Sequence, residues 1–399
     1  MNGTVEASDA RHANRSAVLW ALLQRGTATR LELGSAARLS PATVSRVVDG
    51  LTGEGLVRDS PLVPTGRRGR RISPVAFNGD VGAVVGVDLG GSNCRLVATD
   101  LLGRVLARTR RRTPSRLSTA KLARWVSDQA LALLEDRSVG RVAVGLPGIV
   151  DPQTGAVRGA PNLPQVEGLS FIEAIRDQVP VPVTFDNDSN MAVLGEIRLG
   201  GGRGKRNVVM FTIGTGLGAG VVMDGRLLRG RSGLVGELGY LPVGLDGTTL
   251  ESLLSAHGLM AQAAQRGVHL TSLTAMFALS APKALQEIRK RFSKGLLTAL
   301  VAVTVAYEPD VVVLGGGVAN SLRETIGGLE KELHTIVPEG PELAVSAIGD
   351  AAGAFGAVVA GLHDAYVQLG VDPSLLDGSV GPELTGVLAE FTEVSADAD

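Results

Sequence analysis

The chain has 399 residues, of which 44% are hydrophobic and 20% are charged. This balance is that of a globular protein with room for two or three domains. Its one cysteine, Cys94, excludes an intrachain disulfide and a cysteine-rich zinc site. No stretch approaches the roughly eighteen apolar residues of a membrane span, and the polar residues 1–11 lack the apolar segment of a secretory signal. The sequence therefore predicts a cytoplasmic protein without a membrane segment.

Charge is unevenly distributed, although the formal net charge is −1. Residues 1–80 contain eleven arginines, seven acidic residues and no lysine, which gives them a charge of about +4. Residues 371–399 contain seven acidic residues and no lysine or arginine. A basic end on an otherwise neutral chain is typical of a segment that binds nucleic acid.

The basic segment predicts three helices. Residues 14–24 carry apolar side chains at helical spacing, and Gly26 suits the C-cap of that helix. A shorter helix fits residues 30–39. Ser40 is a good N-cap and Pro41 suits the first turn of a third helix. The apolar stripe that turns this third helix toward the core consists of Val44, Val47, Val48 and Leu51.

The opposite face of the third helix is suited to the major groove of DNA, because its small polar groups and one guanidinium can reach phosphates and base edges. These residues are Ala42, Thr43, Ser45 and Arg46. Residues 53–58 then begin a strand, residues 65–71 form a basic loop, and residues 72–77 return as a strand. The predicted wing residues, suited to phosphates or a minor groove, are Arg67, Arg68, Arg70 and Arg71. The order of elements predicts a winged helix; the alternative is a three-helix domain with a solvated arginine loop.

Three strands in the rest of the chain, at residues 81–87, 208–211 and 311–314, each lead into a glycine-rich turn. Glycine lets backbone N–H groups approach a phosphate, so the turns predict a nucleotide site, and the carboxylate in the first turn could hold Mg²⁺ through water. The candidate residues are Asp88, Gly90, Gly91, Ser92, Gly214, Thr215, Gly216, Gly315, Gly316 and Gly317. The alternative is a set of tight turns that do not bind nucleotide.

Between these turns lie side chains suited to a polyol. A strand at residues 181–185 leads into Asn187 and Asp188 and then a helix at 191–197. Asp188 could take a proton from a sugar hydroxyl as a general base, and Asn187 could hydrogen-bond hydroxyls. Further amide and carboxylate groups come from Asn162, Glu237 and Glu251. The alternative roles are helix capping for the residues at 186–188 and structural contacts for the two glutamates.

Taken together and in order, these pieces resemble the ROK family, named for repressors, open reading frames and kinases, over residues 10–362. The segments that carry the resemblance are 88–92, 145–148, 160–162, 187–190, 214–216, 236–239, 250–251 and 315–317. The resemblance implies an actin-like ATPase fold with two α/β lobes around a cleft, in a homodimer or tetramer. The start of the chain is similar to the MarR-like winged helices of bacterial repressors.

In ROK kinases the residue matching Asp188 is the catalytic base, and the glycine turns hold ATP. The resemblance also implies sugar contacts for Asn162, Asn187, Glu237 and Glu251, and a closing helix at residues 349–361. This chain departs from the pattern at the histidine that family kinases use for sugar and zinc, which is Tyr240 here, and at a common lysine, which is Asn93. Residues 244–251 replace the family's cysteine-rich zinc segment and contain no cysteine, so zinc is not expected. The ring of Tyr240 could instead stack on a sugar.

The predicted organisation is a winged helix at residues 1–78, a small lobe at 79–186 completed by about 347–364, a large lobe at 187–346 and an acidic tail at 365–399. The first functional hypothesis is a DNA-binding repressor whose partners are an operator duplex and a sugar or sugar-derivative effector. The second is an ATP-dependent sugar kinase with a DNA-binding head, which would use ATP and Mg²⁺. The third is a scaffold without a small ligand. An arginine run at residues 104–116 fits either a solvated edge strand or auxiliary DNA contact.

Overall fold

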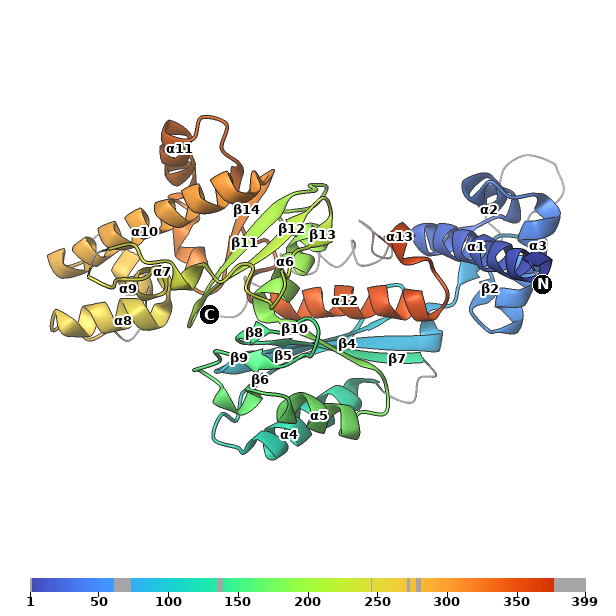
Figure 1. Ribbon diagram of the computed structural model, residues 1–399, viewed down its shortest axis with the longest axis horizontal. Helices are drawn as coiled ribbons and strands as arrows, with labels where there is room; N and C mark the ends of the chain where they lie inside the picture. Colours follow the sequence, from blue (N-terminus) through green and yellow to red (C-terminus); the bar gives the residue numbers. More distant parts are fainter. Residues whose placement is uncertain are drawn as a thin grey trace.

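The computed structural model describes residues 2–60, 73–134, 139–244, 246–270, 273–277 and 281–376. Figure 1 shows them in three bodies, each with its own sheet: the N-terminal segment on the right, a small lobe below the centre and a large lobe on the left. Two helices, α6 (Asp188–Leu199) and α12 (Ala352–Gln368), run between the lobes.

The N-terminal body is a winged helix. Its three helices pack on an antiparallel sheet of order β1-β3-β2. The elements are α1 (Asn2–Arg25), β1 (Thr27–Ala28), α2 (Arg30–Ala37), α3 (Pro41–Gly53), β2 (Val57–Asp59) and β3 (Val75–Phe77). The strand β1 was not predicted, because two residues carry no periodic signal.

The end of α1 and the start of α3 follow the local sequence, whereas α1 begins at Asn2, well before the predicted helix at residues 14–24. Gly26 is in the left-handed region with φ of +68°, and the backbone N–H of Thr43 donates to Ser40 Oγ at 3.3 Å. The prediction that a strand begins at Gly53 was wrong. Gly53 is the last residue of α3, and Gly55, with φ of +76°, then turns the chain into β2. The wing loop with its four arginines lies outside the described residues.

The two lobes share one sheet topology. The small-lobe order is β10-β7-β4-β5-β6 and the large-lobe order is β13-β12-β11-β14-β15. In each sheet the first three strands along the chain form an antiparallel meander, and the next two are added in parallel beside the first. The strands are β4 (Gly82–Leu89), β5 (Asn93–Asp100), β6 (Val105–Arg112), β7 (Val139–Leu146), β10 (Val183–Asn187), β11 (Val208–Ile213), β12 (Leu217–Met223), β13 (Arg226–Leu227), β14 (Val311–Gly315) and β15 (Glu342–Val345). A separate pair, β8 (Ile149–Val150) and β9 (Val157–Arg158), borders the cleft side of the small lobe.

Helices cover both faces of each sheet, so the central strands are apolar on both sides. In the small lobe α4 and α5 cover one face and α12 the other; in the large lobe α7, α8 and α10 cover one face and α6 the other. The remaining bounds are α4 (Thr119–Leu134), α5 (Ser170–Gln178), α7 (Leu250–Leu254), α8 (Ala256–Gln265), α9 (Thr274–Phe277), α10 (Lys283–Tyr307), α11 (Ile326–Ile336) and α13 (Pro373–Leu376). Among the described residues no helix has the length and apolar character needed to cross a bilayer.

The helices α6 and α12 approach each other so closely that their contact requires glycine. A Cβ on Gly356 of α12 would lie 1.5 Å from the carbonyl oxygen of Met191 in α6, and one on Gly195 of α6 would lie 2.6 Å from the carbonyl oxygen of Ala352. Glycine therefore lets the backbones of the two interlobe helices touch.

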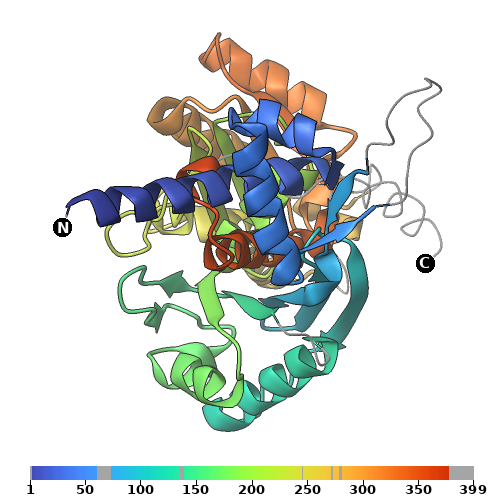
Figure 2. The same ribbon diagram turned by 90° about the vertical axis from the view of Figure 1, so that its right-hand side faces the viewer.

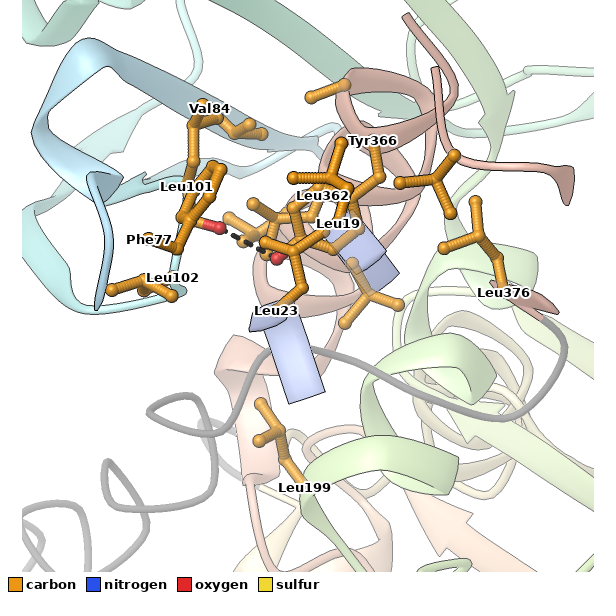
Figure 3. Close-up of a cluster of buried hydrophobic side chains, with 14 of the residues drawn as sticks. Leu19, Leu23, Phe77, Val84, Leu101, Leu102, Leu199, Leu362, Tyr366 and Leu376 are labelled. Carbon is orange, nitrogen blue, oxygen red and sulfur yellow. Dashed lines mark hydrogen bonds between the residues drawn. The ribbon is translucent and has the colours of Figure 1, made fainter. Parts of the chain in front are cut away.

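The far end of α12 carries the winged helix. Figure 3 shows Leu19 and Leu23 of α1 packed with Leu362 and Tyr366 of α12, beside Leu101 from the turn that follows β5. The Tyr366 hydroxyl donates to the carbonyl oxygen of Leu101 at 2.7 Å. In Figure 2, viewed from the winged-helix end, the winged helix lies in front of the body, with α1 beside the near end of α12. The winged helix and the body thus share one hydrophobic core.

Residues after α12 add to this contact. The backbone N–H of Asp372 donates to Ser16 Oγ at 2.7 Å, Arg15 donates to the carbonyl oxygen of Leu369 at 3.1 Å, and Leu376 of α13 is buried in the same core. The packed structure therefore extends through Leu376, well into the predicted acidic tail, and the rest of that segment lies outside the described residues.

Substituting Gly356→Ala tests the helix contact. The added methyl group would overlap the Met191 carbonyl, so we expect a loss of about 3 kcal/mol in the free energy of unfolding. Urea unfolding measures it. The control is Gly50→Ala in α3, where nothing lies within 4 Å and alanine should be neutral or stabilising. Equal stability of the Gly356→Ala variant and the parent would show that the helices are not in backbone contact.

Candidate functional site

The three glycine turns each follow a sheet strand, one in the small lobe and two in the large lobe. The first follows β4 in the small lobe, and the second and third follow β11 and β14, which are parallel neighbours with Thr212 opposite Gly315. Gly316 has φ of +86°, and a Cβ there would lie 2.5 Å from the carbonyl oxygen of Ile213. Only glycine allows this close approach of the second and third turns.

The first turn also touches the predicted polyol loop. A Cβ on Gly91 would lie 2.8 Å from the carbonyl oxygen of Asn162, whose side chain is exposed. Candidate nucleotide residues and a candidate sugar residue therefore meet at one place, as expected for a site that would bring phosphate and sugar together. Ser92 is exposed, and its carbonyl oxygen accepts from the backbone N–H of Thr113 at 3.0 Å.

Asp88 is within β4 and faces the first turn of α12. A Cβ on Gly353 would lie 2.8 Å from its carboxyl carbon. Burial and the negative charge of Asp188 raise the pKa of Asp88 to about 7, against the opposing effect of Arg95. Arg95 lies 3.5 Å from the Asp88 carboxylate and donates to Asp350 at 2.8 Å. It therefore joins the end of β4 to the segment before α12.

The ion pair between Asp88 and Arg95 affects how Asp88 could hold Mg²⁺. Within the described residues no group of three or more histidine, cysteine or acidic side chains is arranged to hold a metal ion. Asp88 is the residue that would face an ion carried by nucleotide phosphates, and such an ion would share this carboxylate with a guanidinium.

Asn187 and Asp188 stand where β10 passes into α6. Asn187 Oδ1 caps the helix by accepting from the backbone N–H groups of Ser189 and Asn190 at 2.8 and 3.1 Å, and its Nδ2 donates to the carbonyl oxygen of Gly148 at 2.9 Å. This amide therefore has a structural task and keeps one free N–H for a ligand. Burial raises the pKa of Asp188 to about 6, although hydrogen bonds from Ser189 lower it.

The two glutamates complete an acidic wall. Burial, with the charges of Asp188 and Glu251, raises the pKa of Glu237 to about 7. Glu251 has a pKa raised by burial, and its Oε2 accepts from the backbone N–H of Leu217 at 2.8 Å, next to the second glycine turn. The wall offers hydrogen-bond acceptors to a polyol and repels bare anions. Tyr240 is 64% exposed, and its hydroxyl lies near Gly159 of the small lobe, so its ring is accessible for stacking.

A hydrogen-bonded turn replaces the cysteine-rich segment of family kinases. The backbone N–H of Val243 donates to the carbonyl oxygen of Thr248 at 2.8 Å, and that of Leu250 donates to Leu241 at 3.0 Å. Thr249 then caps α7 through a capping box with Ser252. Residue 245 lies outside the described residues. Backbone and side-chain hydrogen bonds thus hold this turn at the site.

Sequence reasoning missed Arg95, Asp350 and Arg229. Arg229 follows β13 of the large lobe and donates to Asp186 Oδ2 of the small lobe at 2.7 Å; Asp186 Oδ1 accepts from Asn190 at 2.8 Å. This ion pair joins the lobes directly behind Asn187. No local pattern distinguishes these residues, because their partners are distant in sequence.

The surface of α3 predicted to face DNA is only partly exposed. Ala42 and Arg46 are exposed. Thr43 shares a hydrogen bond with Ser40 at 3.0 Å, and Arg30 of α2 donates to the backbone oxygen of Ser45 at 3.2 Å. Arg30 also forms an ion pair with Asp49 at 2.9 Å, so this unpredicted residue fixes α2 against α3. The predicted wing residues Arg67, Arg68, Arg70 and Arg71 lie outside the described residues.

Comparison with known proteins identifies the class. The model of the ROK family matches residues 84–362, so the chain belongs to the ROK family. Its body has the actin-like ROK kinase fold, and the N-terminal segment adds a winged helix-turn-helix. A crystal structure of a ROK family transcriptional regulator, a homologue of the E. coli MLC protein, superposes with a TM-score of 0.72 over 91% of this chain and 99% of that chain at 21% identity, a likeness that shows the fold.

Curated relatives include both kinases and repressors. The glucokinase of Thermotoga maritima is 29% identical over 281 residues, which cover 64% of this chain and 88% of the kinase. The xylose repressor of Caldicellulosiruptor bescii is 28% identical over 243 residues, covering 58% of this chain and 59% of the repressor. The match thus spans about three fifths of the repressor's length.

The acidic wall gives a pH prediction. The pKa of Glu237 is 4.5 ordinarily and about 7 in the folded protein, so the folded state binds the proton more tightly and loses stability as pH rises between these values. Glu237→Gln should therefore be more stable than the parent at pH 8, by ~1–3 kcal/mol, and the difference should shrink toward pH 5. Urea unfolding across pH measures it. Exposed Glu339→Gln is the control, and a pH-independent effect of Glu237→Gln would contradict the prediction.

Proposed function

We propose that this chain is a DNA-binding transcriptional repressor whose kinase-type body binds a sugar or sugar derivative in the cleft. The observation that carries the proposal is the shared core between the winged helix and α12, because the other end of α12 adjoins Asp88 in the cleft. The repressor and regulator among the relatives support the DNA-binding role, and the glucokinase supports a sugar as the ligand.

In this proposal, α12 links effector binding in the cleft to the position of the winged helix. Effector bound between Asn162 and Glu237 would contact both lobes and favour the closed cleft. The helix α12 touches Asp88 through Gly353, and Tyr366 near its other end lies in the core shared with α1. A change in the angle between the lobes therefore moves the winged helix, provided that the effector binds the two states with unequal affinity.

The proposed assembly is a homodimer or tetramer. Two winged helices on a dimer would read half-sites about 34–36 Å apart, one turn of DNA. A small rotation of each winged helix changes that spacing and weakens binding to a palindromic operator. The effector would thus release DNA without unfolding any part of the protein.

DNA binding is tested with a duplex selected from a random library by the full-length protein. Arg46→Ala should weaken binding to this duplex by about 1–3 kcal/mol, because an exposed guanidinium on α3 is lost. Fluorescence anisotropy at fixed salt gives the Kd. Arg203→Ala, an exposed arginine in the large lobe, should leave the Kd unchanged. Failure to select any duplex at low salt would refute the proposed function.

The proposed coupling between effector binding and DNA affinity is tested at Tyr366, near the end of α12. Tyr366→Phe removes the donor to the Leu101 carbonyl and should reduce the effector-induced change in DNA affinity by about 1 kcal/mol, roughly fivefold. Titration of DNA with and without the most stabilising sugar of a thermal-shift panel measures the change. The control is Tyr307→Phe in α10, and the Kd for the sugar alone should be the same in all three proteins. An unchanged coupling would mean that the signal takes another route.

The alternative function is an ATP-dependent sugar kinase with a DNA-binding head. Asp188 favours it, because a cleft carboxylate with a pKa of about 6 suits a general base near neutral pH. Coupled ADP release with ATP, Mg²⁺ and a sugar panel is the assay. Turnover that disappears in Asp188→Asn supports this function; no turnover with a sugar that stabilises the protein leaves the cleft as a sensor.

A further inference from the structure

The arginine run at residues 104–116 has no part in the roles proposed for the cleft and for α3. Residues 101–127 contain eight lysines and arginines and no acidic residue, in a chain whose net charge is −1. Six of these side chains lie on β6 or at its ends, and all six are exposed. They are Arg104, Arg108, Arg110, Arg111, Arg112 and Arg116. Arg111, Arg112 and Arg116 form no ion pair within the described parts of the chain.

The strand register places most of this charge on one face of the small-lobe sheet. The strand β6 is the edge of that sheet, and Arg108, Arg110 and Arg112 pair with Val97, Arg95 and Asn93 of β5. Side chains at alternate positions share a face. These three arginines, here called the arginine row, therefore lie on the face of β5 that carries Val97.

This is the face that α12 covers, and α12 carries the winged helix at its far end. Val97 belongs to the core that contains Leu19 and Leu23 of α1, and its neighbour Gly86 in β4 touches α12. The row begins beside Arg104, in the turn after β5, where Asp100 accepts from the backbone N–H of Arg104 at 2.8 Å. Leu101 and Leu102 of the same turn pack against the winged helix. Along β6 the row therefore leads away from the winged helix over the side of the body.

We propose that the arginine row is a second DNA-contacting surface, which binds backbone phosphates of duplex flanking the segment read by α3. Alternate residues of a strand are about 6.8 Å apart, which is the axial rise of two base steps of B-DNA. Guanidinium groups bind phosphates in a forked geometry and carry charge at every working pH. A flanking duplex that bends toward the body meets a row of positive charge that matches every second phosphate of one strand along the helix axis.

The proposal rests on the proposed function, since the flanking duplex is brought there by α3. Charged side chains on an edge strand also prevent edge-to-edge aggregation. Edge protection makes no prediction about DNA length or salt, whereas phosphate contacts release counterions and give each arginine a share of the salt dependence. The dependence of binding on DNA length and on salt therefore distinguishes phosphate contact from edge protection.

The experiment uses the full-length protein and two duplexes: the selected duplex trimmed to its minimal length, and the same duplex with about fifteen base pairs added on each side. The variant Arg108→Gln/Arg110→Gln/Arg112→Gln should bind the short duplex as the parent does. On the long duplex it should lose the additional affinity, and the slope of log K against log salt should fall by about 2.7, or 0.9 per arginine. The control variant, Arg203→Gln/Arg291→Gln/Lys294→Gln, removes the same charge from exposed positions of the large lobe.

The outcomes are distinct. An unchanged slope on the long duplex overturns the proposal and leaves the row as edge protection, while the proposed function stands. Equal losses on both duplexes, or in the control variant, mean a general charge effect and also overturn it. Inorganic polyphosphate serves as a second probe: if the row variant loses polyphosphate binding but not long-duplex binding, the surface belongs to another polyanion and the proposal fails. If α3 binds no selected duplex, the proposed function and this inference fall together.

Discussion

The backbone contact between α6 and α12 is the interaction on which the rest of the structure depends. Gly195 and Gly356 bring the two helices together without side chains between them. The first helix begins with Asp188 in the cleft, and the second passes Asp88 and ends in the core beneath α1. Lobe angle, cleft geometry and winged-helix position are therefore set by one pair of helices, whose backbones leave little room to adjust independently.

In the proposed repressor, this arrangement would let a kinase fold control DNA binding. The proposed effector would touch polar residues of both lobes, which the ion pair of Arg229 with Asp186 already joins behind the candidate site. The winged helix is mounted on apolar packing and a few buried hydrogen bonds instead of a flexible linker. A rigid mounting transmits a rotation, which a flexible connection would absorb.

Individual residues of the candidate site could be predicted from the sequence, but the contacts between them could not. Gly91 and Asp188 could be proposed because a glycine turn and a carboxylate at a strand end carry local signals, and Glu237 because residues 236–239 resemble a ROK motif. The structure added the task of each group: Asn187 caps α6, and Glu251 supports the turn at Leu217. The ion pairs of Arg95 and Arg229 could not be predicted, since their partners are brought together only by the pairing of strands and lobes.

What the sequence by itself determined is local. Helix caps at Gly26 and Ser40, the apolar stripe of α3 and the strand-then-glycine turns follow from neighbouring residues, because backbone conformation and periodicity are short-range properties. Tertiary structure decided what no window of residues contains: the repeated topology of the lobes, the glycine contact of α6 with α12, and the core shared by Leu19 and Tyr366. Those features depend on contacts between residues far apart in the chain, and only the folded backbone brings such residues within reach of one another.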